Sequence, residues 1–287
     1  MEDYAKDPSV AKESEKALSA RIDAYITDYL LKVMNLSEEA GELTLSGRLS
    51  GLVHRIRRNV LLTAKDVLRE AENSRFIPRD FELSIGYGAG AVAPYRLRLP
   101  DGSDALLSGT ADRVDVYRAE DGTNYLRIVD YKTGVKSFKL ADVDAGSNLQ
   151  VFMYAISISE NAKGKYENAK PAAMIYMMTT AKELTLNRIL AEDEIEQKAS
   201  ESFERQGVVL DQADVRAALE TDVTSFQAKF KVPEKLAELF EEVKGAVREA
   251  GVTIKSGHVV ANPKSDGRTT ACDRCVYRPV CRFEKKA

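Results

Sequence analysis

Two apolar stretches near the middle of the chain contain carboxylates where a strand should be buried, and this pattern constrains the fold most. Residues 105 to 117 and 125 to 132 have the composition of two long strands joined by a tight hairpin connection. Asp112 and Asp115 interrupt the first strand, and Asp130 interrupts the second. Because a buried unpaired carboxylate is costly, each acid needs a partner, and a divalent cation is one.

The side chains of the second strand divide between its two faces. Asp130 and Lys132 are two positions apart and project to one side, while Val129 and Tyr131 project to the other. A carboxylate and an ammonium group therefore share one small volume. The plain alternative is a surface ion pair at a strand end, which contributes little to stability.

The first strand offers two acids, and only one of them can face the same site. Asp112 and Asp115 are three positions apart, so a regular strand turns them to opposite sides. We interpret Asp112 as a metal ligand and Asp115 as structural. Asp112, Asp130 and the backbone carbonyl of Tyr131 offer the hard oxygen ligands that suit magnesium or manganese. Lys132 would lie beside them.

Helices are expected around this sheet. Apolar residues at three- and four-residue spacing predict helices over residues 8 to 35, 47 to 74 and 147 to 161. Further strands are predicted over residues 81 to 87, 95 to 99 and 172 to 178. Residues 190 to 250 are charge-rich and predict mostly helical structure that ends before Gly251.

These elements predict one α/β domain with a mixed central sheet flanked by helices. Residues 1–75 form its N-terminal helical part and residues 76–180 its catalytic core. Residues 181–287 form a helical elaboration and a C-terminal cysteine segment. No Pro/Gly/Ser-rich linker divides the chain into two domains.

Composition excludes some classes of protein. The net charge of -3 argues against a wholly basic nucleic-acid-coating protein, although a local basic groove beside metal-binding carboxylates stays compatible with it. The sequence contains no run of roughly eighteen apolar residues, so it predicts no membrane span. The N-terminal residues carry acids and lack the apolar segment of a secretory signal, so a cytoplasmic location is expected.

Three cysteines near the C-terminus predict a metal site. Cys272, Cys275 and Cys281 are clustered and odd in number, which is untypical of a disulfide framework. Their thiolates favour zinc or an iron–sulfur cluster, and both normally take four ligands. The chain has no fourth cysteine.

Four ordered stretches resemble the PD-(D/E)XK nucleases of the RecB type, and most closely the C-terminal nuclease domain of AddB proteins. They are FELSIG at residues 81 to 86, GTADRVD at 109 to 115, VDYKTG at 129 to 134 and LQVFMY at 149 to 154. The resemblance covers roughly residues 76 to 281. It implies a restriction-endonuclease-like fold and magnesium-dependent hydrolysis of DNA, with manganese as the alternative metal.

The resemblance also implies roles for individual residues. Asp112 and Asp130 hold the metal, while Lys132 orients or deprotonates the attacking water and stabilises charge on the scissile phosphate. Gln150 faces the site from the following helix, one turn from Tyr154.

Three further residues are assigned by the same resemblance. Tyr154 and Arg113 are placed in substrate binding, with helix packing as the alternative for Tyr154. Glu82 resembles an upstream acid of the family and is a further candidate metal ligand, with a solvated strand residue as the alternative.

Two of the family's ligands have no match in this chain. His54 lies too close to Glu82 for the family's upstream metal-binding histidine, so we interpret it as a surface or packing residue. His258 is interpreted as structural. The three cysteines resemble the C-terminal ligands of the AddB iron–sulfur cluster, whose fourth cysteine lies upstream. Both absences indicate an excised fragment, with a natural short homologue as the alternative.

The partners implied are DNA, in particular single-stranded DNA, an AddA-type helicase-nuclease chain and the upstream part of the same AddB-type protein. The process implied is double-strand-break repair and recombination, with exonuclease action. No sequence here resembles a P-loop, so unwinding must lie elsewhere. A catalytically incomplete DNA-binding or scaffold module and a stand-alone RecB-like exonuclease remain as alternatives.

Overall fold

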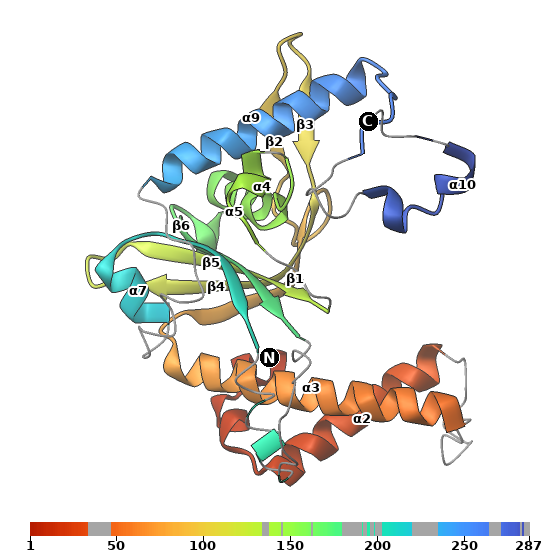
Figure 1. Ribbon diagram of the computed structural model, residues 1–287. Helices are drawn as coiled ribbons and strands as arrows, with labels where there is room; N and C mark the ends of the chain where they lie inside the picture. The colour runs from red at the N-terminus through yellow and green to blue at the C-terminus, as the bar shows by residue number, and fades with distance from the viewer. Residues whose placement is uncertain are drawn as a thin grey trace.

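A five-stranded sheet lies between two layers of helices (Figure 1). The computed structural model describes residues 1–33, 47–133, 138–144, 146–161, 163–179, 191, 194–195, 198, 203–219, 235–263, 271–281 and 283. Within these segments no helix is both long enough and apolar enough to cross a membrane. The predicted mixed sheet flanked by helices is confirmed.

The sheet is mixed, with strand order β1-β4-β5-β6-β7. Its strands are β1 (Ile77–Ile85), β4 (Gly109–Arg118), β5 (Asn124–Lys132), β6 (Lys170–Met178) and β7 (Arg205–Val209). β5 and β6 pair in parallel and all other neighbours are antiparallel. A parallel pair needs a crossover, and helix α5 (Gln150–Asn161) lies within it.

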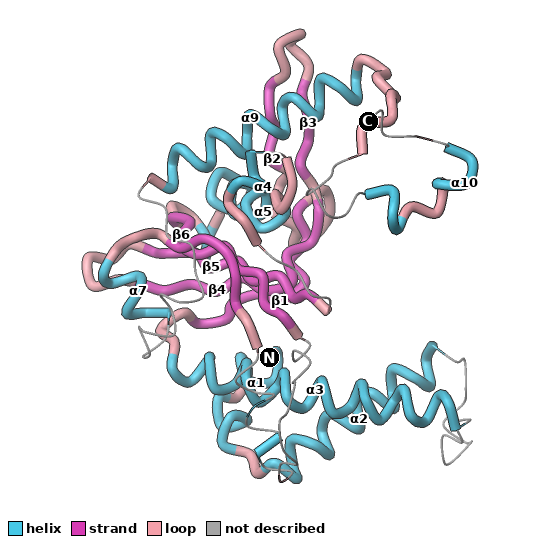
Figure 2. Tube along the Cα trace, in the orientation of Figure 1, coloured by secondary structure: helices cyan, strands magenta, loops and turns pink. Residues whose placement is uncertain are grey.

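A separate hairpin stands beside the main sheet. It is formed by β2 (Tyr95–Arg98) and β3 (Asp104–Leu107), and it contacts α5 and α9 (Leu236–Lys255) (Figure 2). The single strand predicted over residues 105 to 117 is therefore two strands. They separate at Ser108 because β3 pairs with β2 while β4 enters the main sheet.

The opposite face of the sheet meets the N-terminal helices. They are α1 (Glu2–Lys6), the 3-10 helix η1 (Pro8–Lys12), α2 (Glu15–Val33) and α3 (Gly47–Asn73). The helix predicted over residues 8 to 35 is thus divided. The hydroxyl of Ser14 accepts a hydrogen bond from the backbone N–H of Ala17 at 3.3 Å, which caps the start of α2. Residues 34 and 35 lie outside the described residues.

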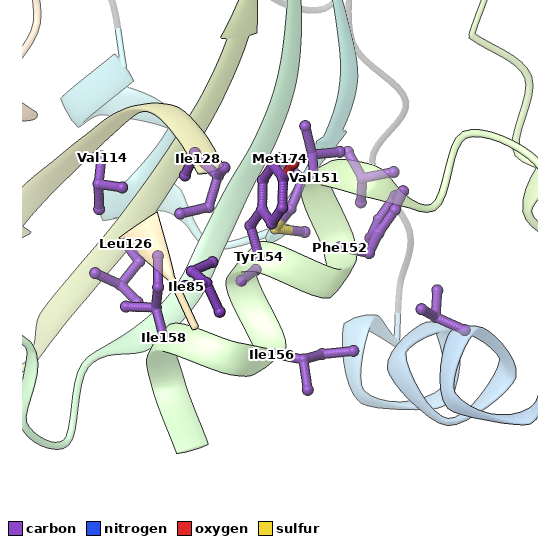
Figure 3. Close-up of a cluster of buried hydrophobic side chains, with 14 of the residues drawn as sticks. Ile85, Val114, Leu126, Ile128, Val151, Phe152, Tyr154, Ile156, Ile158 and Met174 are labelled. Atoms are coloured by element: carbon purple, nitrogen blue, oxygen red, sulfur yellow. The ribbon is translucent and has the colours of Figure 1, made fainter. Parts of the chain in front are cut away.

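A hydrophobic core fills the space between the sheet and α5. Figure 3 shows side chains of α5 and of the strands meeting there. Val114 of β4 and Ile128 of β5 are fully buried in this core, so these two positions face α5. Val129 faces the layer of α3 and packs against Val67.

The region from 190 to 250 contains a strand that the sequence did not predict. β7 pairs with β6, and its Val208 and Val209 are fully buried. Gly207 has a φ of +154°, and a Cβ there would lie 2.0 Å from the carbonyl oxygen of Met174, so only glycine fits this close backbone approach.

Two helices of the same region agree with the prediction of helical structure. α7 (Ala213–Leu219) and α9 are helical, although much of the region lies outside the described residues. The expected end before Gly251 is wrong, because α9 continues to Lys255. A Cβ at Gly251 would lie 3.2 Å from the side chain of Leu99, so glycine here permits close packing on the hairpin.

Candidate active site

Two carboxylates from neighbouring strands lie opposite each other at one end of the β4–β5 ladder. The register pairs Arg113 with Val129, and continuing it by one residue sets Asp112 opposite Asp130. Oδ2 of Asp112 accepts a hydrogen bond from the backbone N–H of Tyr131 at 2.7 Å. At the end of the β4–β5 ladder, the Asp112 carboxylate therefore accepts the backbone N–H, a role that a backbone carbonyl of the neighbouring strand has in the rest of the ladder.

Lys132 connects Asp130 to α5. Its Nζ forms an ion pair with Asp130 and donates a hydrogen bond to Oε1 of Gln150 at 3.2 Å. Nε2 of Gln150 donates in turn to the hydroxyl of Tyr154 at 3.0 Å. A chain of polar contacts thus runs from the end of β5 into α5, through four of the residues selected from the sequence.

Burial differs among these side chains. Asp130 is 1% exposed, whereas the side chain of Lys132 is 26% exposed. Asp112 and Gln150 are partly exposed. A substrate would therefore meet Lys132 and Asp112 at the strand end and would find Asp130 behind them.

Tyr154 packs in the core. It is 8% exposed, and a Cβ at Gly109 would lie 2.8 Å from its ring. Gly109, the first residue of the GTADRVD stretch, therefore leaves the space that the ring occupies. The structure favours the packing alternative for Tyr154, whose hydroxyl supports Gln150.

The donor set suits a hard divalent cation. Magnesium is usually held by one or two carboxylates together with water and substrate phosphates. Asp112 has a second oxygen beside the one that binds Tyr131 N–H. In an antiparallel pair the N–H and C=O of a residue point to the same neighbouring strand, so the Tyr131 carbonyl also faces the Asp112 side.

Glu82 lies close to this site in the register but is not grouped with it. β1 pairs Phe81 with Arg113 and Leu83 with Ala111, which puts Glu82 opposite Asp112. Glu82 is exposed, and its φ of 49° lies in the left-handed region that non-glycine residues seldom adopt. Across the described part of the chain, no three or more His, Cys, Asp or Glu side chains converge as metal ligands. Ligation by Glu82 therefore stays a prediction.

Arg113 does not fit the substrate-binding role that the sequence suggested. Its side chain is 1% exposed and faces α3. Nε donates to Asp115, Nη1 to the hydroxyl of Tyr131 and Nη2 to Glu70. All three nitrogens are used inside the protein, so none is left to bind DNA.

A buried network of charges surrounds Arg113. Three carboxylates meet three guanidinium groups between α3 and the sheet, namely Asp66, Glu70 and Asp115 with Arg113, Arg127 and Arg205. Asp115 binds Arg113 and Arg127, in line with the structural role expected for it.

Glu70 is the central acid of this network. Its carboxylate contacts Arg113 at 2.8 Å, Arg127 at 2.9 Å and Arg205 at 3.1 Å. Burial alone would raise its pKa, but the three arginines hold the pKa of Glu70 well below its usual range. Sequence reasoning missed Glu70. The available signal was an acid one helical turn from Asp66 on the apolar side of α3, beside Val67 and Ala71.

The family of the chain is shown by comparison with known proteins. A family model described as the PD-(D/E)XK nuclease superfamily matches residues 1–282. The chain belongs to this superfamily. That range contains the two carboxylates, Lys132 and Gln150, so the site lies within the matched nuclease domain.

Relatives of this nuclease domain are parts of larger proteins. The AddB chain of the ATP-dependent helicase/deoxyribonuclease of Clostridium acetobutylicum is 29% identical over 258 residues, covering 84% of this chain and 22% of that protein. The AddB chain of Alkaliphilus oremlandii is 25% identical over 300 residues, covering 99% of this chain and 26% of that protein. The AddB chain of Desulforudis audaxviator is 32% identical over 256 residues, covering 83% of this chain and 22% of that protein. The chain spans about a quarter of the length of these relatives, and the homology to AddB is confirmed.

The histidines and cysteines of the nuclease domain lie at its surface. His54 on α3 and His258 after α9 are exposed. The cysteines belong to η4 (Ala271–Arg274), α10 (Arg278–Cys281) and the residue after η4, and they are free thiols that are partly or fully exposed. In the segments that the structure describes they do not converge with other ligands into a metal site.

A cavity of about 690 Å³ lies on the α3 side of the nuclease domain. Apolar side chains of α2 and α3 form most of its wall, and it reaches Tyr131 and Thr133. Asp112, Asp130 and Lys132 do not line it. The cavity is therefore separate from the candidate site.

Proposed function

We propose that this domain hydrolyses DNA phosphodiester bonds with magnesium or manganese held at Asp112 and Asp130. The observation that carries the proposal is the meeting of two strand-end carboxylates, a partly exposed lysine and the Gln150 side chain at one end of the sheet. Membership of the PD-(D/E)XK nuclease superfamily supports the reaction class.

The charges of the three ionisable side chains give them different roles. Asp112 and Asp130 carry two negative charges and Lys132 one positive charge, so together they are negative and attract a cation. When bound, the cation supplies charge neutralisation at the scissile phosphate and a water of lowered pKa. Asp112 is oriented for this role by the N–H of Tyr131.

Lys132 is held where it can act on the attacking water and the phosphate. Asp130 and Gln150 both bind its ammonium group, which limits the positions that a long flexible side chain can take. The ammonium can then orient the water and stabilise charge that develops on the phosphate oxygens. Gln150 acts through Lys132 and is a positioning residue.

The substrate and partners are proposed from the relatives. The name of these relatives joins an ATP-dependent helicase to a deoxyribonuclease. We therefore propose exonucleolytic cutting of single-stranded DNA, assembly with the remainder of an AddB-type protein and an AddA-type chain, and a role in double-strand-break repair by recombination. The three cysteines would serve an iron–sulfur cluster in such an assembly.

The test is cleavage of end-labelled single- and double-stranded DNA with magnesium, with manganese and with EDTA. Asp130→Ala and Lys132→Ala should each lower cleavage by at least about a hundredfold. Thermal stability should stay nearly unchanged. Glu120→Gln is the control, since this exposed residue lies at the turn of the same β4–β5 hairpin.

Two results would contradict the proposal. Cleavage at the wild-type rate by either active-site variant would remove Asp130 or Lys132 from the site. DNA binding without metal-dependent cleavage by the wild-type protein would favour the alternative of a catalytically incomplete scaffold module.

A further inference from the structure

Tyr131 is held through both its backbone and its side chain. Its backbone N–H donates to Asp112 at 2.7 Å, and its hydroxyl accepts a hydrogen bond from Nη1 of Arg113 at 2.8 Å. In the chain it stands between Asp130 and Lys132. One residue therefore connects the buried network on the α3 side to the backbone that carries the candidate catalytic groups.

The Arg113 end of this connection has a fixed geometry. A guanidinium group is planar, and here each of its three nitrogens donates to a different residue. Glu70 and Asp115, which accept two of these bonds, are themselves held by Arg127. The hydroxyl of Tyr131 thus binds a donor that cannot turn without breaking several buried ionic contacts.

The network spans the elements that frame the site. Through Glu70 of α3 it joins β4, β5 and β7, and its three buried carboxylates balance its three buried guanidinium groups. Such a set resists displacement because moving one member leaves another buried charge without compensation. It therefore fixes the middle of β4 and of β5 relative to α3.

We propose that Tyr131 is a positioning residue for the metal site, and that its hydroxyl transmits the geometry of the buried network to Asp112 and Asp130. This inference rests on the proposed function. With the hydroxyl held, the backbone of β5 keeps the Tyr131 N–H on Asp112 and the Tyr131 carbonyl on the same side. Partners that orient a metal-binding carboxylate in this way affect metal affinity without touching the metal.

The hydroxyl is not needed to fill space. The side chain of Tyr131 is only half-buried and borders the cavity between the helices and the sheet. A phenylalanine can occupy the same volume, and Arg113 keeps its bonds to Asp115 and Glu70. Tyr131→Phe therefore removes one hydrogen bond and leaves the packing in place.

The experiment compares manganese binding by the wild type, Tyr131→Phe and Tyr125→Phe, in the absence of DNA. Tyr125 is the matched control, because it lies near the other end of β5 and its hydroxyl donates to Gln212 at 2.9 Å. Each variant loses one tyrosine hydroxyl. Binding is followed by electron paramagnetic resonance and calorimetry, at a temperature where circular dichroism shows all three proteins folded.

Tyr131→Phe should raise the dissociation constant for manganese about tenfold, and Tyr125→Phe should leave it unchanged. In cleavage assays, the magnesium concentration for half-maximal rate should rise by about the same factor for Tyr131→Phe. The KM for DNA at saturating magnesium should stay at the wild-type value. A purely structural role would lower the melting temperature without changing metal affinity.

The possible outcomes distinguish the positioning role of Tyr131 from the proposed metal-dependent function. Wild-type manganese affinity in folded Tyr131→Phe would overturn the positioning role and leave the proposed site intact. An equal loss of affinity in Tyr125→Phe would also overturn it, because the effect would then belong to the strand as a whole. Absence of manganese binding in the wild type would overturn the proposed metal site, and this inference with it.

Discussion

Replacing Glu70 by glutamine tests how far the buried network stabilises the fold. Glu70 is 5% exposed and contacts Arg113, Arg127 and Arg205 at 2.8 to 3.1 Å. Glutamine keeps the size of the side chain but leaves three buried guanidinium groups facing two carboxylates. Removing one partner of a buried ion pair costs about 3 to 5 kcal/mol. We expect the free energy of unfolding at neutral pH to fall by that amount.

The loss should depend on pH with a defined sign. The pKa of Glu70 is lowered in the folded protein, whereas the pKa of a glutamate in an unfolded chain is about 4.3. The stabilisation from its ionised form is therefore complete above that value. It falls by up to about 1.4 kcal/mol per pH unit below it, because the unfolded chain binds the proton first. The difference between the wild type and Glu70→Gln should stay constant near neutral pH and shrink in acid.

The assay is urea unfolding followed by circular dichroism, at neutral pH and at several values down to about pH 3. Glu72→Gln is the control, since Glu72 is exposed on the same helix two residues away and should change stability little. Equal stability of Glu70→Gln and the wild type at neutral pH would refute the reasoning. A stability difference that persists unchanged into acid would refute its electrostatic basis.

Other contacts lead to three more expected outcomes. Asp115→Ala should lower the free energy of unfolding by about 3 to 5 kcal/mol, since it leaves two buried arginines short of a partner; metal binding lost by a variant that stays fully stable would instead make Asp115 a ligand. Gly109→Ala should reduce cleavage, because its Cβ would displace Tyr154 and with it Gln150; unchanged rates would contradict the contact. The chain as purified anaerobically should hold no stable iron–sulfur cluster, as judged by iron and sulfide analysis and visible absorption, since its three cysteines supply three thiolates. A full four-iron cluster would require a ligand other than cysteine, with His258 the first candidate.

The sequence predicted the relative faces of Asp130, Lys132 and Asp115 because these depend on local geometry. Strand alternation alone puts Asp130 and Lys132 on one face and turns Asp115 to the other. The same rule should have separated Arg113 from Asp112, its neighbour. Arg113 was assigned to the substrate because it belongs to the same short motif, and the structure corrects that assignment.

Features that depend on distant partners escaped prediction. β7 is five residues long, and its strand conformation comes from pairing with β6 and from the approach of Gly207 to Met174. Glu70 is an acid inside a helix, and only the meeting of α3 with β4, β5 and β7 shows that three arginines surround it. No pattern within the helix identifies those partners.

The two faces of β4 and β5 explain how adjacent residues can have different roles, but face alone does not define the site. Val114 and Ile128 share the face of Asp130, yet both are fully buried under α5. The candidate site is where that face reaches the strand ends and Lys132 is partly exposed. At the same strand ends, the opposite face carries the hydroxyl of Tyr131 into a network closed to solvent. Substitutions on the first face should therefore affect cleavage directly, whereas those on the second should act through stability or metal affinity.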